Sequence, residues 1–187
     1  MRLETPRLVI RNWQDGDREL FFRINSDDRV MAFFPFRRDR EQADRLFDML
    51  RDGIARNGYG FAALELRATG APIGFAGIQP AGLEPVLPAE TFEIGWRLAP
   101  EFWGSGYATE AARALLAYGF DHLGLDEIVS FAVWNNTRST AVMERIGMRR
   151  DPGSDFDHPK VPESHPDLRR HVLYRLTRKD WLARAAP

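Results

Sequence analysis

The sequence contains no cysteine, which excludes disulfides, thiolate metal ligands and a cysteine nucleophile. It also lacks a charge excess. Its 26 Lys and Arg residues nearly balance 27 Asp and Glu residues, and the net charge of −1 gives no field that attracts nucleic acid or an anionic membrane. No run approaches the roughly 18 apolar residues of a spanning helix, and the N-terminus MRLETPRLVIRNW has no apolar signal-peptide core. We therefore expect a soluble, cytoplasmic protein that binds neither nucleic acid nor membrane.

The composition is that of a globular protein. The 187 residues are 44% hydrophobic and 12% aromatic, which is enough to build one sizeable core. We therefore expect a single domain over residues 1–187. The predicted order of elements is strand, two helices, three strands, helix, strand, helix, strand. This order is typical of a mixed α/β sandwich in which helices cover a mostly antiparallel sheet.

Hydrophobic periodicity predicts the individual elements. Alternation predicts strands at 7–13, 59–67, 72–80, 90–100, 127–134 and 171–177, and helical spacing predicts helices at 15–25, 39–58, 107–123 and 137–147. Gly58 suits the position just past a helix end, and Gly95 within a strand indicates a bulge. The segment 151–170 carries four prolines and is predicted to be a long loop, a kind of segment that is often functional.

The stretch PEFWGSGYATEA (100–111) places Gly104 and Gly106 between a predicted strand and a predicted helix. Glycine lets the backbone approach a ligand, and the free N–H groups at a helix start attract anions, above all phosphates. The same glycines would equally serve a tight turn without a ligand. A P-loop is excluded because no Lys-Ser/Thr pair follows, and the dinucleotide fingerprint is excluded because it needs three glycines in an early parallel βαβ unit.

Two blocks of sequence narrow this choice. EIGWRLAPEFWGSGYATEA, followed by NNTRSTAVMERIGM, resembles the GNAT superfamily of acyl-CoA-dependent N-acetyltransferases. More narrowly, it resembles the RimJ/RimL-like branch of ribosomal-protein N-terminal acetyltransferases, and the resemblance extends from ETPRLVIR to HVLYRLTRKDWL. The family's loop pattern is Gln/Arg-x-x-Gly-x-Gly/Ala. Trp103 departs from its first position, where this branch often carries tryptophan.

The resemblance implies the GNAT fold, α/β (α+β) in class: a mixed, mostly antiparallel sheet of about six or seven strands with splayed central strands, flanked by about four helices. It also implies acetyl-CoA as the cosubstrate, no metal, and a cytoplasmic enzyme of bacterial type. The pantetheine arm would pair with exposed backbone, and the loop would hold the pyrophosphate through N–H groups. The coenzyme-binding residues so implied are Arg97, Leu98, Ala99, Trp103, Gly104, Ser105, Gly106, Tyr107, Ala108, Thr109, Asn136 and Ser139.

Direct attack of an amine on the thioester needs a base, a polarised carbonyl and an acid for the leaving thiolate. In several GNAT enzymes, a glutamate on the strand that holds Glu93 acts as the base through water. The alternative is that Glu93 is an ordinary exposed strand residue. Rival bases lie in the proline-rich loop, where histidine suits proton transfer near neutral pH. These rivals are Asp155, Asp157, Glu163, His158 and His165.

The segment NNTRS matches the family's Asn-x-x-Ser at Asn136 and Ser139. The resemblance places Asn136 on the pantetheine or on the acceptor carbonyl, and Ser139 near the coenzyme sulfur as the acid. The alternative is that Asn136 or Thr137 simply caps a helix. The aromatic cluster MAFFPF (31–36) either walls the acceptor site or fills the core, and Trp181 is predicted to anchor packing.

Three classes of function follow from these features. The first is an N-acetyltransferase whose acceptor is a protein or peptide N-terminus, with a small-molecule amine (an amino sugar, polyamine or antibiotic) as the alternative acceptor. The second is a coenzyme-A-binding module without efficient turnover, and the third is a protein that binds another nucleotide in the glycine loop. The protein is expected to be a monomer or a homodimer.

Overall fold

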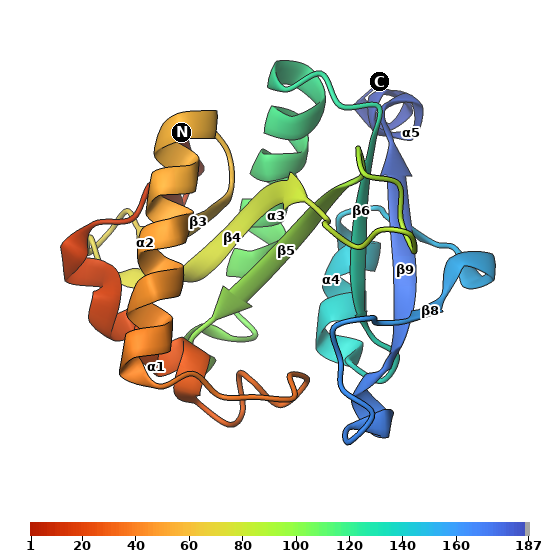
Figure 1. Cartoon of the computed structure of the whole chain (residues 1–187). Coiled ribbons are helices and arrows are strands. Elements are labelled where there is room, and N and C mark those ends of the chain that lie inside the picture. The colour runs from red at the N-terminus through yellow and green to blue at the C-terminus, as the bar shows by residue number, and fades with distance from the viewer. Residues whose placement is uncertain (186–187) are drawn as a thin grey trace. The chain divides into compact units, whose positions relative to one another are not determined.

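The computed structural model describes residues 1–185, which form nine strands and five α-helices (Figure 1). The chain divides into two compact units. The first consists of Met1–Gln79 and Gly95–Ala114, and the second of Pro80–Ile94 and the described residues from Leu115 onward. Strand β5 and helix α3 each contribute residues to both units.

The sheet of the first unit is hydrogen-bonded in the order β1-β2-β3-β4-β5. Its strands are β1 (Arg2–Glu4), β2 (Leu8–Arg11), β3 (Phe61–Leu66), β4 (Pro72–Pro80) and β5 (Phe92–Leu98). The pairs β1–β2, β2–β3 and β3–β4 are antiparallel, with Leu8 opposite Leu66 and Ala62 opposite Ala76. The strands predicted at 7–13, 59–67, 72–80 and 90–100 are therefore confirmed, whereas β1 was not predicted.

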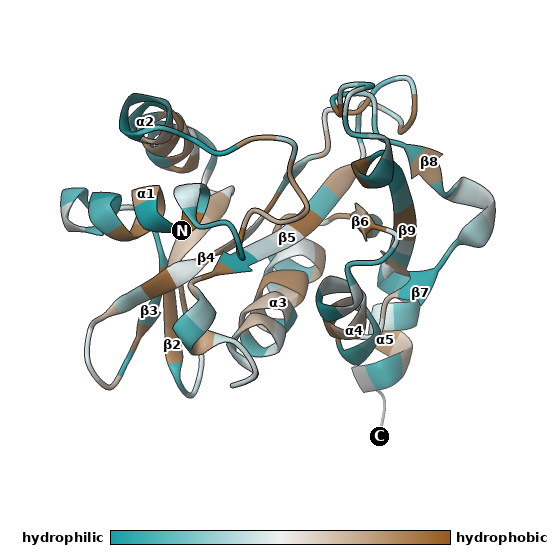
Figure 2. Cartoon of the chain, turned by 90° about the horizontal axis from the view of Figure 1, so that it is seen from below, coloured by the Kyte–Doolittle hydropathy of each residue, from teal (hydrophilic) through white to brown (hydrophobic). Residues whose placement is uncertain are grey.

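Helices α1 (Arg18–Ser26) and α2 (Arg40–Asn57) cover one face of this sheet, and the start of α3 (Tyr107–Ala117) lies on the other face (Figure 2). Asp39 caps α2 by accepting a hydrogen bond from the Gln42 N–H, and Gly58 ends the helix with a φ of 79°. Both predicted helices and the Gly58 end are therefore confirmed.

The aromatic core of the first unit holds α1 and α2 against the sheet. The Trp13 ring lies edge-on to Phe21 at 4.9 Å and contacts Phe47 at 5.3 Å and Phe75 at 6.1 Å between ring centroids. Burial of each such ring contributes roughly 2–3 kcal/mol, and favourable ring geometry adds about 1 kcal/mol. This cluster therefore holds α1 and α2 against β4 through Phe21, Phe47 and Phe75.

The second unit is built on the antiparallel pair β6 (Glu127–Val133) and β9 (Arg170–Thr177), in register from Glu127–Thr177 to Val133–His171. The short strands β7 (Arg149–Arg150) and β8 (Phe156–Asp157) also pair with β9. The start of β5 pairs with β6 in parallel, at Phe92–Ile128 and Glu93–Val129. The structure thus has a mixed, mostly antiparallel sheet, as predicted, with more strands than expected because β1, β7 and β8 are too short to show periodicity.

Helices α4 (Thr137–Arg145) and α5 (Arg178–Ala185) complete the second unit. The predicted helix at 107–123 ends as α3 at Ala117 and continues as a single π turn at 118–122. Trp181 on α5 packs on Phe120 at 5.7 Å between ring centroids, which confirms its predicted packing role. None of the helices among residues 1–185 is long and apolar enough to cross a membrane.

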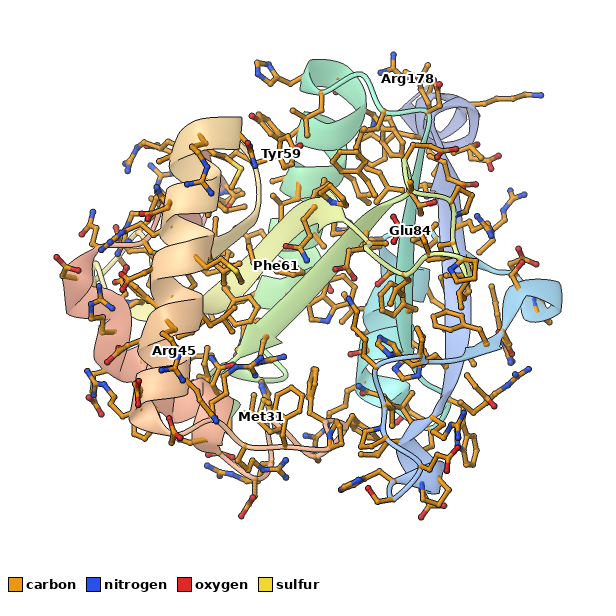
Figure 3. All side chains as sticks on the ribbon, in the orientation of Figure 1. Met31, Arg45, Tyr59, Phe61, Glu84 and Arg178 are labelled. Atoms are coloured by element: carbon orange, nitrogen blue, oxygen red, sulfur yellow. The ribbon has the colours of Figure 1, made fainter. Side chains whose placement is uncertain are left out.

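The predicted bulge at Gly95 stays a prediction. A Cβ there would lie 3.1 Å from the Phe61 ring, so close packing against this ring also favours glycine. The register of the β3–β4 hairpin shifts at Leu64/Glu65. Figure 3 labels Phe61 on β3. The segment 151–170 is ordered, with 3-10 turns at Pro152–Ser154 and Pro166–Leu168 and the strand β8 between them.

Candidate active site

The glycine loop connects the end of β5 to the start of α3 in the first unit. After a 3-10 turn at Pro100–Phe102, Gly104 and Gly106 adopt φ values of 75° and 80°. A Cβ at Gly104 would meet no atom within 4 Å, so its backbone conformation, not crowding, requires glycine there. The two glycines therefore form a tight turn, and the same turn leaves the backbone of the loop exposed.

The peptide N–H groups of this loop are available to a ligand. Residues 104–106 are exposed, and among the main-chain hydrogen bonds of the described residues none uses the N–H groups of Gly104, Ser105 or Gly106. The helix ladder begins only where the Glu110 N–H donates to the Gly106 carbonyl at 3.0 Å. A run of free N–H groups at the positive end of a helix suits an anion such as a diphosphate.

Trp103 fastens this loop to the strand that precedes it. Its indole Nε1 donates to the Leu98 carbonyl at 2.8 Å. The Ala99 N–H donates to Ile73 of β4 at 3.0 Å, and a Cβ at Gly74 would lie 2.3 Å from the Arg97 carbonyl oxygen, so both peptide groups face β4. Because peptide groups alternate along a strand, Leu98 is the residue of 97–99 whose main-chain groups face away from β4.

An ion pair that sequence reasoning missed supports the loop from the N-terminal segment. Glu110, in the first turn of α3, accepts hydrogen bonds from the Thr5 hydroxyl at 2.6 Å, the Arg7 N–H at 2.8 Å and Arg7 Nε at 2.6 Å. Arg7 Nη1 also donates to the Ser105 carbonyl at 2.9 Å, and its guanidinium lies 4.5 Å from the Tyr107 ring centroid. Burial alone would raise the pKa of Glu110, but the hydrogen bonds from Thr5 and Arg7 lower it below its usual value.

A glutamate in the first turn after the glycines was the available sequence signal for this interaction. Its partners are 103 and 105 positions earlier in the chain, and no local pattern relates them. Arg7 and Glu110 therefore became visible only once β2 and α3 had been placed in the same unit.

In the second unit, Asn136 caps α4: its side-chain oxygen accepts from the Ser139 N–H at 3.3 Å. The predicted capping role of Asn136 is therefore confirmed, while its predicted coenzyme contact stays a prediction. Ser139 is partly buried in the first turn of α4, and within the described part of the chain its hydroxyl has no hydrogen-bond partner. A hydroxyl in this state is free to bond a ligand.

Glu93 lies at the end of the parallel register between β5 and β6. It is partly buried, opposite Val129. Ile94 and Ser130 follow this pair on the two strands. The Ser130 hydroxyl donates to the Ile94 carbonyl at 2.9 Å, so a side chain, not a strand N–H, bonds this carbonyl. Within the described part of the chain, the parallel register of β5 with β6 comprises Phe92 and Glu93.

The rival bases of the 151–170 segment have different surroundings. Asp155 bonds Arg150 Nη2 at 2.6 Å and accepts from the Leu173 N–H at 3.2 Å. The His158 ring lies 4.8 Å from the His171 ring, and burial, together with the charges of His171 and Lys160, lowers the pKa of His158 to about 4.

The other three residues of that set are exposed. Asp157 lies 3.6 Å from Arg170, and His165 Nδ1 lies 2.9 Å from the Ser164 hydroxyl. Glu163 is exposed as well.

The segment 31–36 divides between the two predicted roles. Met31 is fully buried and fills the core beneath the helix junction, whereas Phe36 is 43% exposed and lines a surface cavity. Figure 3 shows Met31 in the segment that follows α1 and Arg45 on α2. The Arg97 side chain donates to Asn25 Oδ1 at 2.6 Å, on the side of β5 that carries these helices.

The structure thus brings the predicted residues into two groups. The first unit holds 97–99 and the loop 103–109, and the second unit holds Glu93, Asn136 and Ser139. Among the described residues, no group of three or more His, Asp or Glu side chains is arranged to hold a metal ion.

Comparison with known proteins identifies the family. The acetyltransferase (GNAT) domain family matches residues 7–149. The chain belongs to this family. It is 33% identical to an uncharacterized N-acetyltransferase, YnaD, of Bacillus subtilis (strain 168), over 81% of this chain and 84% of the relative.

Two further similarities extend over nearly the whole chain. The chain is 28% identical to an FsC-acetyl coenzyme A-N(2)-transacetylase of Aspergillus fumigatus, over 99% of this chain and 80% of that protein. A GNAT-family acetyltransferase from Bacillus anthracis superimposes with a TM-score of 0.78 at 26% identity, over 96% of this chain and 99% of that one. The fold is thus the GNAT fold, and acetyl-CoA is the acyl donor that the family implies.

Proposed function

We propose that this GNAT acetyltransferase moves an acetyl group from acetyl-CoA to a primary amine by direct attack, and that the amine is the N-terminus of a peptide or protein. The glycine loop is the single observation that carries the proposal. Gly104 and Gly106 hold an exposed backbone at the positive end of α3, and no main-chain carbonyl of residues 1–185 accepts a hydrogen bond from the N–H groups of this loop. Neutral N–H donors of this kind suit a pyrophosphate and require no lysine.

The remaining coenzyme contacts follow the strand. Leu98 is the residue whose main-chain groups face away from β4. Because its carbonyl accepts from Trp103, its N–H is the group with which a pantetheine carbonyl would pair, as in an added strand. Trp103 holds the loop against this strand end, so the pyrophosphate and pantetheine contacts keep a constant spacing. Acetyl-CoA supplies an activated thioester, and the chain must bind it, orient it and manage two protons.

The first proton comes from the attacking ammonium. Glu93 is our assignment for the base, acting through water. Asp155 is held in an ion pair with Arg150, which weakens it as a rival. Burial lowers the pKa of His158 to about 4, so this histidine is no stronger a base than a carboxylate and loses its usual advantage near neutral pH. The exposed residues Asp157, Glu163 and His165 stay as the alternatives.

The second proton goes to the leaving thiolate. Ser139 is our assignment for the acid, because its hydroxyl is unpaired within residues 1–185 and it sits in the first turn of α4. Asn136 orients this turn through its cap. Capping and coenzyme contact are compatible, since the Asn136 side-chain oxygen bonds the helix while its amide N–H₂ group remains a donor.

The acceptor assignment rests on the RimJ/RimL-like pattern, Trp103 in the loop together with Asn136 and Ser139. A small-molecule amine is the second candidate, and one observation favours it. A cavity of about 490 Å³ lies against α2, a volume within the range of small-molecule sites.

An acceptor screen tests the proposal. Purified protein is incubated with acetyl-CoA and a panel of N-terminal peptides and small amines, and products are identified by mass spectrometry alongside thiol release. Acetylated product supports the enzyme and names the acceptor class. Tight acetyl-CoA binding without release for any amine would favour a coenzyme-binding module. Thermal stabilisation by ATP or NAD but not by acetyl-CoA would overturn the coenzyme assignment, since only a true ligand stabilises the fold.

A further inference from the structure

The cavity of about 490 Å³ lies between the segment 36–38 and the exposed side of α2 in the first unit. Its apolar wall includes Phe36 and Met49, which are 43% and 59% exposed. Its polar lining contains three arginines, Arg37, Arg38 and Arg45, and no carboxylate. An exposed aromatic ring and thioether beside several guanidinium groups indicate a ligand with an apolar body and a negative group.

The three arginines differ in how their charges are balanced. Arg37 pairs with Asp28 at 2.8 Å, and Arg45 pairs with Glu41 one turn earlier on α2. Arg38 has no carboxylate partner among the described residues; its guanidinium stacks on the Phe36 ring, 4.6 Å from the centroid. It is also partly buried, and burial lowers its pKa. Arg38 is thus a partly desolvated cation without an anion, which is an unfavourable state that an anionic ligand relieves.

A second cation increases this imbalance. Arg97 of β5 is partly buried, donates to the neutral Asn25 side chain at 2.6 Å and lies 4.3 Å from the Phe34 ring centroid. No carboxylate among residues 1–185 pairs with it, and burial and the charge of Arg38 lower its pKa to about 9. Two further carboxylates of α2, Asp44 and Asp48, pair with Arg18 of α1.

We propose that this cavity binds the acceptor through an anionic group, a carboxylate or a phosphate, which Arg38 holds while Phe36 and Met49 contact the acceptor's apolar part. This inference rests on the proposed acetyl transfer for the identity of the ligand as an acceptor. Arg97 extends the positive field from the cavity to β5, the strand whose residue Leu98 is proposed to receive pantetheine.

The charge distribution also defines what the cavity rejects. A polyamine would bring several ammonium groups close to Arg38 and Arg97, neither of which has a carboxylate partner among residues 1–185, and like charges at close range are strongly unfavourable. A peptide fits when an acidic side chain follows its N-terminus, and a small molecule fits when it is an amino acid or an amino phosphate.

A kinetic experiment compares acceptors that carry the anionic group with analogues that lack it. Peptides with aspartate or asparagine as the second residue form one pair, and an amino acid with its amide forms another. We expect the aspartyl peptide and the free amino acid to have KM values about tenfold lower than their neutral partners, the size of one charge-assisted hydrogen bond. Arg38→Gln should remove that preference by raising KM for the anionic acceptors, with kcat little changed. Arg38→Lys, which keeps the charge, should retain part of it.

Arg56→Gln is the matched control, because Arg56 is an exposed arginine near the other end of α2. Its KM values should equal those of the wild type. Equal KM values for charged and neutral acceptors in the wild type, or an unchanged preference in Arg38→Gln, would overturn the inference while leaving acetyl transfer intact.

A binding measurement separates this inference from the proposed function. Phenylacetate, phenyl phosphate and neutral phenylacetamide are titrated into the full chain while the methyl signal of Met49 is followed by NMR. We expect both anions to shift this signal, phenylacetamide to shift it at least tenfold more weakly, and Arg38→Gln to lose the difference. The tighter of the two anions identifies the negative group. Selective anion binding without acetylation of any amine would refute the proposed function alone, and equal binding of all three probes would refute the cavity assignment.

Discussion

Arg7 and Glu110 are joined by two hydrogen bonds, from the Arg7 backbone N–H at 2.8 Å and from its Nε at 2.6 Å. The same guanidinium donates to the Ser105 carbonyl at 2.9 Å and lies over Tyr107. An arginine that follows β1 therefore holds both the glycine loop and the first turn of α3. The interaction positions the loop and leaves the loop's N–H groups free.

Removing this support should weaken coenzyme binding. Arg7→Ala is expected to raise KM for acetyl-CoA about three- to tenfold, to leave KM for the acceptor nearly unchanged and to lower stability by about 1 kcal/mol, because the pair is only partly buried. Steady-state kinetics and thermal unfolding measure these effects. Arg2→Ala, which removes an exposed pair with Glu4, is the control. A change in the acceptor KM alone would contradict the positioning role.

The glycine loop can be tested by its backbone conformation. Gly106→Val should raise KM for acetyl-CoA more than KM for the acceptor, since a β-branched residue at a φ of 80° costs about 1–3 kcal/mol and its Cβ would lie 3.5 Å from Arg7 Nη2. Gly16→Ala is a suitable control, because Gly16 lacks a positive φ and has open space around a Cβ. A larger effect on the acceptor KM would refute the pyrophosphate assignment.

The assignment of Glu93 as the base can be tested by pH dependence. Glu93→Gln keeps the shape of the side chain and removes its basicity, so kcat/KM should fall about 10²-fold near neutral pH. The loss should shrink as pH rises, because the free amine then needs no base. The measurement is the pH profile of kcat/KM for wild type and variant. Identical profiles would remove Glu93 from this role and direct attention to Asp157, Glu163 and His165.

The roles of Ser139 and Asn136 can be tested separately. Ser139 is assigned only to proton transfer, whereas Asn136 also caps α4. Ser139→Ala should lower kcat with little change in acetyl-CoA affinity or stability. Asn136→Ala should lower the free energy of unfolding by about 1 kcal/mol through loss of the α4 cap, and Asn136→Asp should restore it. Turnover, calorimetric coenzyme binding and denaturant unfolding provide the data. Full turnover of Ser139→Ala would end its assignment as the acid.

His158 and His171 lie against each other in the second unit, and from His158 we predict that the folded protein loses stability in acid. The pKa of His158 is lowered from 6.5 to about 4 in the folded protein, chiefly by burial, so between these values the unfolded chain binds more protons than the folded one. The protonation of His158 therefore costs the folded protein nothing above pH 6.5. As pH falls from 6.5 toward 4, the free energy of unfolding decreases by an amount of the order of 2 kcal/mol.

The pH dependence of the unfolding midpoint measures this loss. His158→Asn keeps an acceptor for the Lys160 N–H and should flatten the curve between pH 4 and 6.5. His165→Asn, at an exposed histidine, should leave the curve unchanged. A wild-type midpoint that does not fall across this range would contradict the lowered pKa.

Local patterns in the chain were enough to predict most of the fold. The apolar stripe of α2 and the Gly58 end are short-range features, and each of the longer strands shows its alternation within a few residues. The family blocks likewise identified the loop at Gly104 and Gly106, because the positive φ values there require glycine. The short strands β7 and β8 have two residues each, too few to show a period, and exist because β9 offers them an edge.

Long-range pairing was beyond the reach of local pattern. The sequence contains Arg7 and Glu110 but nothing in it relates them, and the partners of an ion pair depend on which surfaces the folded chain brings together. The same holds for Arg38. The sequence shows one arginine among many, and only the packing of α1, α2 and β5 leaves its side chain without a carboxylate partner among residues 1–185. Periodicity and turn chemistry act over a few residues, whereas burial, charge balance and the direction of a peptide group depend on neighbours that are distant in the chain.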